Sequence, residues 1–196
     1  MIDKKEWIIR SAIKVFFDKG YQQITLDDIA GQADLAKSTL YLYFKDKDDL
    51  FFNSVMYIID ELSANMKKVI DPDDEIFNML FKIFKIQLDI FNKNREFLGM
   101  FFILTNPNIV KNSKKLFESI DQRSLELKKF VENRIKQEIK KGMIRKDVDS
   151  GFMTDVFWGV LITATKKLHE QPSQEDVDSE KLAEKYIDII KYGFKS

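Results

Sequence analysis

The sequence predicts an all-α protein of about nine helices. The chain of 196 residues contains only three prolines and seven glycines, so few residues interrupt a helix. Apolar residues recur at spacings of three and four along most of the chain, and no alternating β-branched run stands out. We therefore expect a three-helix N-terminal head that a long helix joins to a larger helical bundle.

The first three helices form the predicted head. They are expected at about 4–19, 25–34 and 36–43. Gly20 ends the first helix, because glycine readily adopts the backbone conformation that closes a helix. Thr25 is suited to cap the second helix, and Asp28 lies three residues further on, where an acid favours a helix N-terminus. Leu40 and Phe44, four residues apart, are expected to face inward and hold the third helix on the head.

The remaining helices form the predicted body. A long fourth helix starts near residue 47, reaches about residue 69 and ends before the sequence DPDD at 71–74. Five more helices are expected at about 74–92, 95–104, 113–141, 150–169 and 178–194. We accordingly divide the chain into two predicted domains, residues 1–46 and 47–196.

Composition and charge exclude several classes of protein. With 44% hydrophobic and 33% charged residues the chain is globular, and the absence of cysteine excludes disulfide and thiolate chemistry. Neither a signal-peptide pattern nor an apolar run long enough to span a bilayer is present, so we expect a cytoplasmic protein. The formal net charge is zero, so bulk charge alone does not indicate a nucleic-acid partner.

Two short helices separated by a tight turn form a helix-turn-helix pattern. The second helix of such a pair enters the DNA major groove with its first residues against base edges. Here that helix carries hydroxyl and ammonium groups, which bind phosphates and bases. The alternative is that its tyrosines, Tyr41 and Tyr43, are half-buried packing residues with solvated hydroxyls.

Residues 8–50 resemble the DNA-binding head of the tetracycline-repressor (TetR) family. The resemblance rests on many matches in one register over some forty residues. They are Ile8, Ala12, Phe16, Gly20-Tyr21, Thr25, Ile29-Ala30, Ala33, Thr39-Leu40-Tyr41, Tyr43-Phe44, Lys47 and Leu50. The resemblance implies DNA contacts at Thr25, Lys37, Ser38, Thr39, Tyr41, Tyr43 and Lys47.

The turn between the second and third helices departs from the family pattern. Asp34-Leu35-Ala36 replaces the usual Gly-Val-Ser. Aspartate tolerates the left-handed backbone conformation better than most residues, so we expect Asp34 to replace the glycine at modest cost. Ala36 removes a serine cap worth ~1 kcal/mol, and with it a phosphate contact. The changes affect DNA docking rather than the fold.

The last two helices carry the surface predicted to form a dimer. Apolar residues of the 150–169 helix surround nearly the whole helix, apart from a narrow charged sector near Asp155 and Lys166. Such a helix must be covered on most sides, and Gly159 would permit a close approach. The resemblance implies a homodimer formed by the last two helices. We expect its interface to include Trp158, Gly159, Ile162, Tyr186 and Ile190.

The 74–92 helix suggests a ligand pocket. Its apolar face is wide, and Gln87 falls within that face. Burying an amide without partners costs a few kcal/mol, so Gln87 either bonds to nearby backbone or to Arg134 in the core, or lines a ligand cavity. The resemblance implies a small apolar or aromatic effector. Its predicted site comprises Phe84, Gln87, Phe91, Phe101, Phe130, Arg134 and Phe157.

An enzyme reading has little support. His169 is the single histidine, and neither a phosphate-binding glycine loop nor a nucleophile elbow is present. We expect no cofactor and no metal. A helical interaction or adaptor protein would explain the body but not the head. We therefore interpret the chain as a dimeric transcriptional regulator, a repressor that a small effector releases from a palindromic operator in double-stranded DNA.

Overall fold

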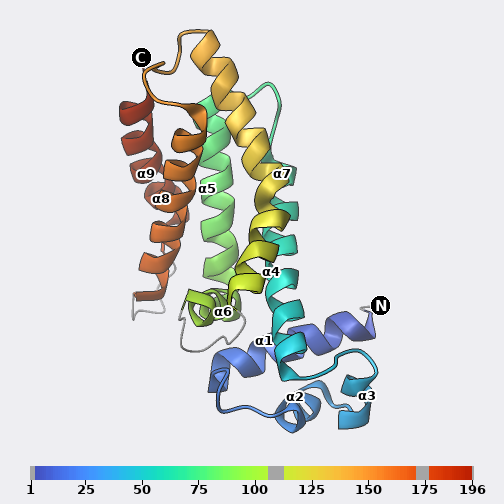
Figure 1. Ribbon diagram of the computed structural model, residues 1–196. Coiled ribbons are helices and arrows are strands. Elements are labelled where there is room, and N and C mark those ends of the chain that lie inside the picture. The colour runs from blue at the N-terminus through green and yellow to red at the C-terminus, as the bar shows by residue number, and fades with distance from the viewer. Residues whose placement is uncertain (1–2, 106–112, 171–176, 196) are drawn as a thin grey trace. The chain divides into compact units, whose positions relative to one another are not determined.

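The described residues of the computed structural model are 3–105, 113–170 and 177–195. They form nine helices and no strand, so the predicted all-α fold is confirmed (Figure 1). The helices are α1 (Lys4–Lys19), α2 (Leu26–Ala33), α3 (Lys37–Tyr41), α4 (Lys47–Val69), α5 (Ile76–Lys93), α6 (Arg95–Thr105), α7 (Ser113–Lys140), α8 (Ser150–Glu170) and α9 (Ser179–Phe194). None of the described helices is both long enough and apolar enough to cross a membrane.

The chain divides into two compact units that do not follow chain order. Unit 1 contains the residues up to Glu61 together with Asn94–Asp121. Unit 2 contains Leu62–Lys93 and the residues from Gln122 onward. Helix α6 and the start of α7 therefore belong to the same unit as the helix-turn-helix. The predicted boundary after residue 46 marks the end of the segment expected to bind DNA, whereas the two units are defined by packing within the chain. The boundary therefore stays a prediction.

The core of unit 1 gathers around α1. Ile8, Phe16 and Leu40 are completely buried, and the Phe16 ring packs edge-on against Phe51 with centroids 5.0 Å apart. Helix α6 lies so close to α1 that any side chain at Gly99 would overlap the ring of Phe17. The first helix thus holds α2, α4 and α6 together.

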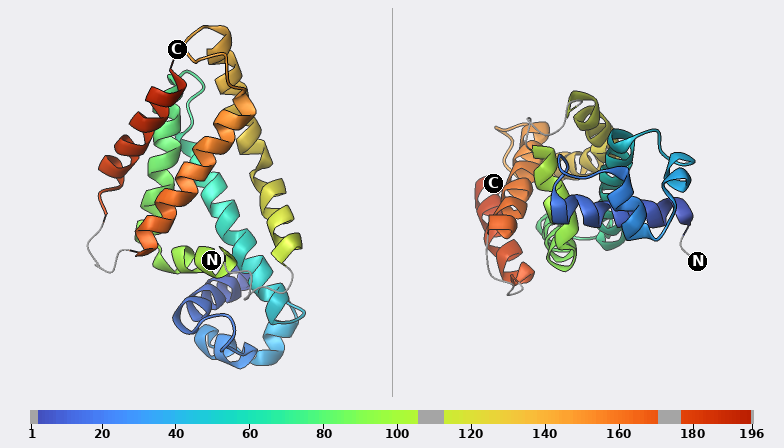
Figure 2. Two further views of the ribbon diagram at one scale, coloured as in Figure 1. Left: turned by 60° about the vertical axis from the view of Figure 1, so that its left-hand side comes forward. Right: turned by 90° about the horizontal axis from the view of Figure 1, so that it is seen from below.

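Unit 2 is built around α5. Helices α8 and α9 both pack against it and against each other (Figure 2). Phe84 of α5 is fully buried; its ring stacks on Tyr186 of α9 at 5.4 Å and meets Phe157 of α8 edge-on at 6.3 Å. The aromatic residues of α5 therefore form the junction of three helices.

Local signals in the head decide where its helices begin and end. Thr25 caps α2, and its hydroxyl and the Asp28 carboxylate form the predicted reciprocal capping box. Asp34 adopts the left-handed conformation, with φ 55° and ψ 47°, as expected for the residue that replaces glycine. Ala36 provides no side-chain cap, and α3 is shorter than predicted, since it ends at Tyr41.

Candidate nucleic-acid interface

Helix α3 is held on the head by two buried side chains. Leu40 is completely buried and Phe44 is only 2% exposed, as the spacing predicted. Lys37, Ser38, Tyr41, Leu42 and Tyr43 are exposed and Thr39 is half-buried. The segment therefore presents hydroxyl, ammonium and aromatic groups on one side while its apolar residues anchor it on the other.

Two of the predicted DNA-binding residues form polar contacts with α2. Lys37 Nζ lies 2.7 Å from a carboxylate oxygen of Asp27, and this bond raises the pKa of the lysine, so that the ammonium stays charged. The Thr25 hydroxyl donates to the Asp28 carboxylate at 2.8 Å. Bonds from Lys19 and then from Thr25 hold the pKa of Asp28 well below its ordinary value. Thr25 thus caps α2; its contact with DNA stays a prediction.

The tyrosines of the segment are open to solvent. Tyr41 is 53% exposed and Tyr43 39% exposed. The ring of Tyr43 lies 6.5 Å from that of Phe44, so it also packs on the anchor of the segment. Leu42 between them is 81% exposed, more than either tyrosine. Leu42 was not among the residues predicted to contact DNA, although its position between two predicted contact residues, Tyr41 and Tyr43, could have indicated it.

Lys47 lies at the first turn of α4 and is only half exposed. Its ammonium donates to the carbonyl oxygens of Tyr21 at 3.0 Å and Ile24 at 3.1 Å, and it lies 4.7 Å from the centroid of the Tyr21 ring. Since an ammonium has three donors, one remains for a phosphate oxygen. The structure therefore gives Lys47 a role within the head that the sequence did not indicate.

We expect the Lys47→Ala variant to lose both stability and DNA affinity. Removing the ammonium leaves two carbonyls without that donor, which costs about 1 kcal/mol of unfolding free energy, and the salt dependence of DNA binding falls by about one counterion. Lys45→Ala is the control, because it removes the same charge from an exposed side chain. A melting temperature equal to that of the control would show that the carbonyl bonds contribute nothing.

Trp7 of α1 fastens the end of α2. Its indole Nε1 donates to the carbonyl oxygen of Ala33 at 2.9 Å. Ala33 is the last residue of α2, directly before the left-handed Asp34, and the final carbonyls of a helix have no partner within that helix. The indole therefore stabilises the turn that leads into α3, at a place where Ala36 offers no cap.

We expect the Trp7→Phe variant to bind its operator about fivefold more weakly, which corresponds to one lost hydrogen bond. The salt dependence should not change, because no phosphate contact is removed. Hydrogen exchange should quicken in α3 and not in α5. The control is Asn78→Ala, which removes an exposed side-chain hydrogen bond to Asp74 in unit 2. Equal operator affinity in the two variants would contradict this positioning role.

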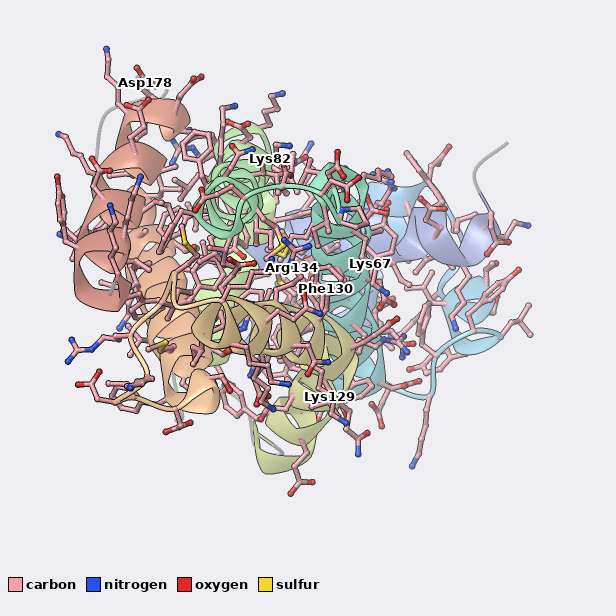
Figure 3. All side chains as sticks on the ribbon, turned by 90° about the horizontal axis from the view of Figure 1, so that it is seen from above. Lys67, Lys82, Lys129, Phe130, Arg134 and Asp178 are labelled. Atoms are coloured by element: carbon pink, nitrogen blue, oxygen red, sulfur yellow. The ribbon has the colours of Figure 1, made fainter. Side chains whose placement is uncertain are left out.

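The predicted effector residues of unit 2 lie in different places, and their contact with an effector stays a prediction. Phe84, Phe91 and Phe157 are at most 1% exposed and fill the core. A cavity of about 180 Å³ lies elsewhere in the unit, where the C-terminal end of α4 meets α7 (Figure 3). Its lining residues are Lys67, Ile70, Glu126, Leu127 and Phe130. Of the predicted set only Phe130 lines this cavity; the side chain of Phe101 lies outside the described residues.

Gln87 and Arg134 each bond to a partner that the sequence did not indicate. Gln87 is 8% exposed, and its amide nitrogen donates to the Thr165 hydroxyl at 2.9 Å. Arg134 points to the turn after α4, where its guanidinium donates to the carbonyls of Pro72 and, at 2.7 Å, Asp74. The core hydrogen bond considered for Gln87 is therefore present, but its partner is Thr165.

The predicted dimer residues differ in exposure. Gly159 is exposed and Ile162 is 45% exposed, whereas Trp158 and Tyr186 are half-buried. Ile190 is only 2% exposed and packs inside unit 2, and its place in a dimer interface stays a prediction. Adjacent residues of a helix point about 100° apart, and the exposed apolar residues of α9 are instead Ile189 and Tyr192, at 69% and 84%.

An all-α chain with an exposed second helix in a helix-turn-helix defines the class of DNA-binding transcriptional regulators. Residues 8–53 match the family model of bacterial regulatory proteins of the tetR family. The chain is 32% identical over 143 residues to the biofilm operon icaADBC HTH-type negative transcriptional regulator IcaR of Staphylococcus aureus, covering 67% of this chain and 72% of that protein. The chain belongs to the TetR family.

Two further similarities agree with this assignment. The HTH-type transcriptional regulator YerO of Bacillus subtilis is 27% identical over 156 residues, which are 78% of this chain but 53% of that protein. The solved structure of the transcriptional regulator FadR from Bacillus subtilis in complex with stearoyl-CoA has a TM-score of 0.81. At 19% identity over 96% of this chain and 98% of that chain, it supports the fold alone.

Proposed function

We propose that the chain acts as a homodimeric repressor that binds a palindromic operator and leaves it when a small apolar effector binds. The observation that carries the proposal is the exposed segment 37–43, formed by α3 and the two residues after it. It presents Lys37, Ser38, Tyr41, Leu42 and Tyr43 away from the buried anchor Leu40. Ammonium and hydroxyl groups suit phosphates, and an exposed leucine suits the methyl group of thymine.

A dimer follows from the need for two such segments. A helix-turn-helix dimer reads two half-sites about one DNA turn apart, so protein symmetry matches operator symmetry. Its support in this chain is a set of exposed apolar side chains on α8 and α9, namely Phe152, Ile162, Ile189 and Tyr192. Exposed apolar residues gathered on neighbouring helices are typical of protein contact surfaces.

The effector is proposed to place its apolar end in the cavity between α4 and α7. Ile70, Leu127 and Phe130 give the cavity an apolar lining. Lys67 and Glu126 also line it and form an ion pair, with Nζ and Oε2 2.6 Å apart. Its volume of about 180 Å³ is below the range typical of whole ligands, so it suits a short apolar group. Only a ligand that prefers one arrangement of the regulator can shift DNA binding.

Selection of genomic fragments by the purified protein tests the proposal. We expect the recovered fragments to share an inverted repeat, and one of them to lie upstream of a gene whose expression rises when this regulator is deleted. Fragments without a common motif would refute operator recognition, and lower expression after deletion would refute repression. Addition of apolar compounds to the bound complex then tests release.

A further inference from the structure

Four residues of α8 form one exposed line along the helix. Asp155, Gly159, Ile162 and Lys166 follow one another at spacings of four, three and four residues, which return to the same face of a helix. All four are exposed. We call this line the α8 stripe. It contains one acid, one glycine, one isoleucine and one base, in that order.

The order of the stripe is self-complementary under a two-fold axis. Suppose that the two-fold axis is perpendicular to α8 and passes between Gly159 and Ile162. The α8 of the second copy then runs antiparallel to the first, and each residue of one stripe faces the residue that lies equally far beyond the axis in the other. Asp155 then faces Lys166 of the second copy, and Gly159 faces Ile162. We propose that the α8 stripe docks on the α8 stripe of a second copy of this chain in this register.

The middle of the α8 stripe has one small residue, Gly159, next to one large residue, Ile162, which suits the proposed antiparallel register. A Cβ atom added at Gly159 would meet nothing within 4 Å, so the surface there is open. The neighbouring Ile162 is 45% exposed and large enough to fill such an open place on a facing helix. Placing the large residue of each copy over the small residue of the other allows the two helices to approach closely.

The opposite charges at the two ends of the α8 stripe favour a second copy of this chain as its partner. Among the described residues neither Asp155 nor Lys166 forms an ion pair, so both charges are available to a partner. The antiparallel register brings opposite charges together twice, once at each end. A parallel arrangement would instead oppose Asp155 to Asp155 and Lys166 to Lys166, and like charges repel. Charge complementarity therefore fixes both the direction and the register.

This inference rests on the proposed homodimer and adds its register, so the test separates the two. Asp155→Lys and Lys166→Asp each create two like-charge contacts per dimer, and we expect each to raise the dimer dissociation constant about tenfold. The double variant restores opposite charges across the axis and should return the constant to within about twofold of the original. Sedimentation equilibrium at low salt measures all of them.

The control is Lys140→Asp, which reverses an exposed charge on α7 away from the stripe and should leave the dimer unchanged. Single variants that weaken the dimer, with no recovery in the double variant, would overturn the register while leaving the dimer intact. An original protein that sediments as a monomer would overturn the dimer itself. Three charge variants that all match the original dimer would remove the stripe from the interface.

Discussion

We expect the Ile162→Glu variant to sediment as a monomer and to bind its operator at least about a hundredfold more weakly than the original protein. Ile162 is 45% exposed on α8 and lies beside the open surface of Gly159. A carboxylate in an apolar contact must give up its hydration without a partner, which costs several kcal/mol. A single head contacts one half-site, so most of the specific affinity disappears with the dimer.

The controls for this variant separate dimer loss from unfolding. Circular dichroism should show unchanged helix content, because the side chain is outside the core of unit 2. Lys140→Glu carries a new carboxylate on α7 and should remain dimeric with full operator affinity. If Ile162→Glu sedimented as a dimer with normal operator affinity, the interface would have to lie on another face.

Local signals made the head predictable. The capping box of Thr25 and Asp28 and the left-handed Asp34 depend on neighbours within a few residues, and both were read correctly. The second role of Lys47 was not, because it depends on carbonyls of Tyr21 and Ile24, more than twenty residues earlier in the chain. Helix periodicity places a lysine on a face but does not identify the backbone that it meets.

The body was predicted less completely, because its helices pack on several sides. An apolar arc on α5 did not distinguish a core from a cavity, and Phe84, Phe91 and Phe157 proved to be core residues. On α9 a difference of one residue changes the exposure completely: Ile190 is buried and Ile189 is exposed. A helix with apolar residues on both sides does not reveal which side faces its own chain.

We expect the second large effect in the Thr165→Val variant, which loses stability because Thr165 is the partner of the buried Gln87 amide. Thr165 is completely buried; its hydroxyl accepts from the Gln87 amide at 2.9 Å and donates to the carbonyl of Leu161 at 2.9 Å. Valine has nearly the same shape, so the packing is kept. The buried amide of Gln87 loses its partner, which costs about 1–3 kcal/mol and lowers the melting temperature by roughly 2–10 °C.

The reciprocal variant, Gln87→Leu, should behave differently. It removes the buried amide itself, and the Thr165 hydroxyl keeps its bond to Leu161. Stability should therefore stay within about 1 kcal/mol of the original protein or rise slightly, because no donor is stranded. The double variant Thr165→Val with Gln87→Leu should recover most of the stability that Thr165→Val loses. Thermal melts of the original protein and the three variants form a double-mutant cycle that measures this coupling.

Titration of the same variants with an effector assigns the role of Gln87. If the amide only joins α5 to α8, Gln87→Leu should release operator DNA at the same effector concentration as the original protein. If the amide also binds the effector, release should need a concentration roughly five to 150 times higher, which corresponds to about 1–3 kcal/mol of binding. Because Gln87→Leu is expected to remain stable, a shifted titration cannot be attributed to unfolding. An unshifted titration would exclude Gln87 from the effector site.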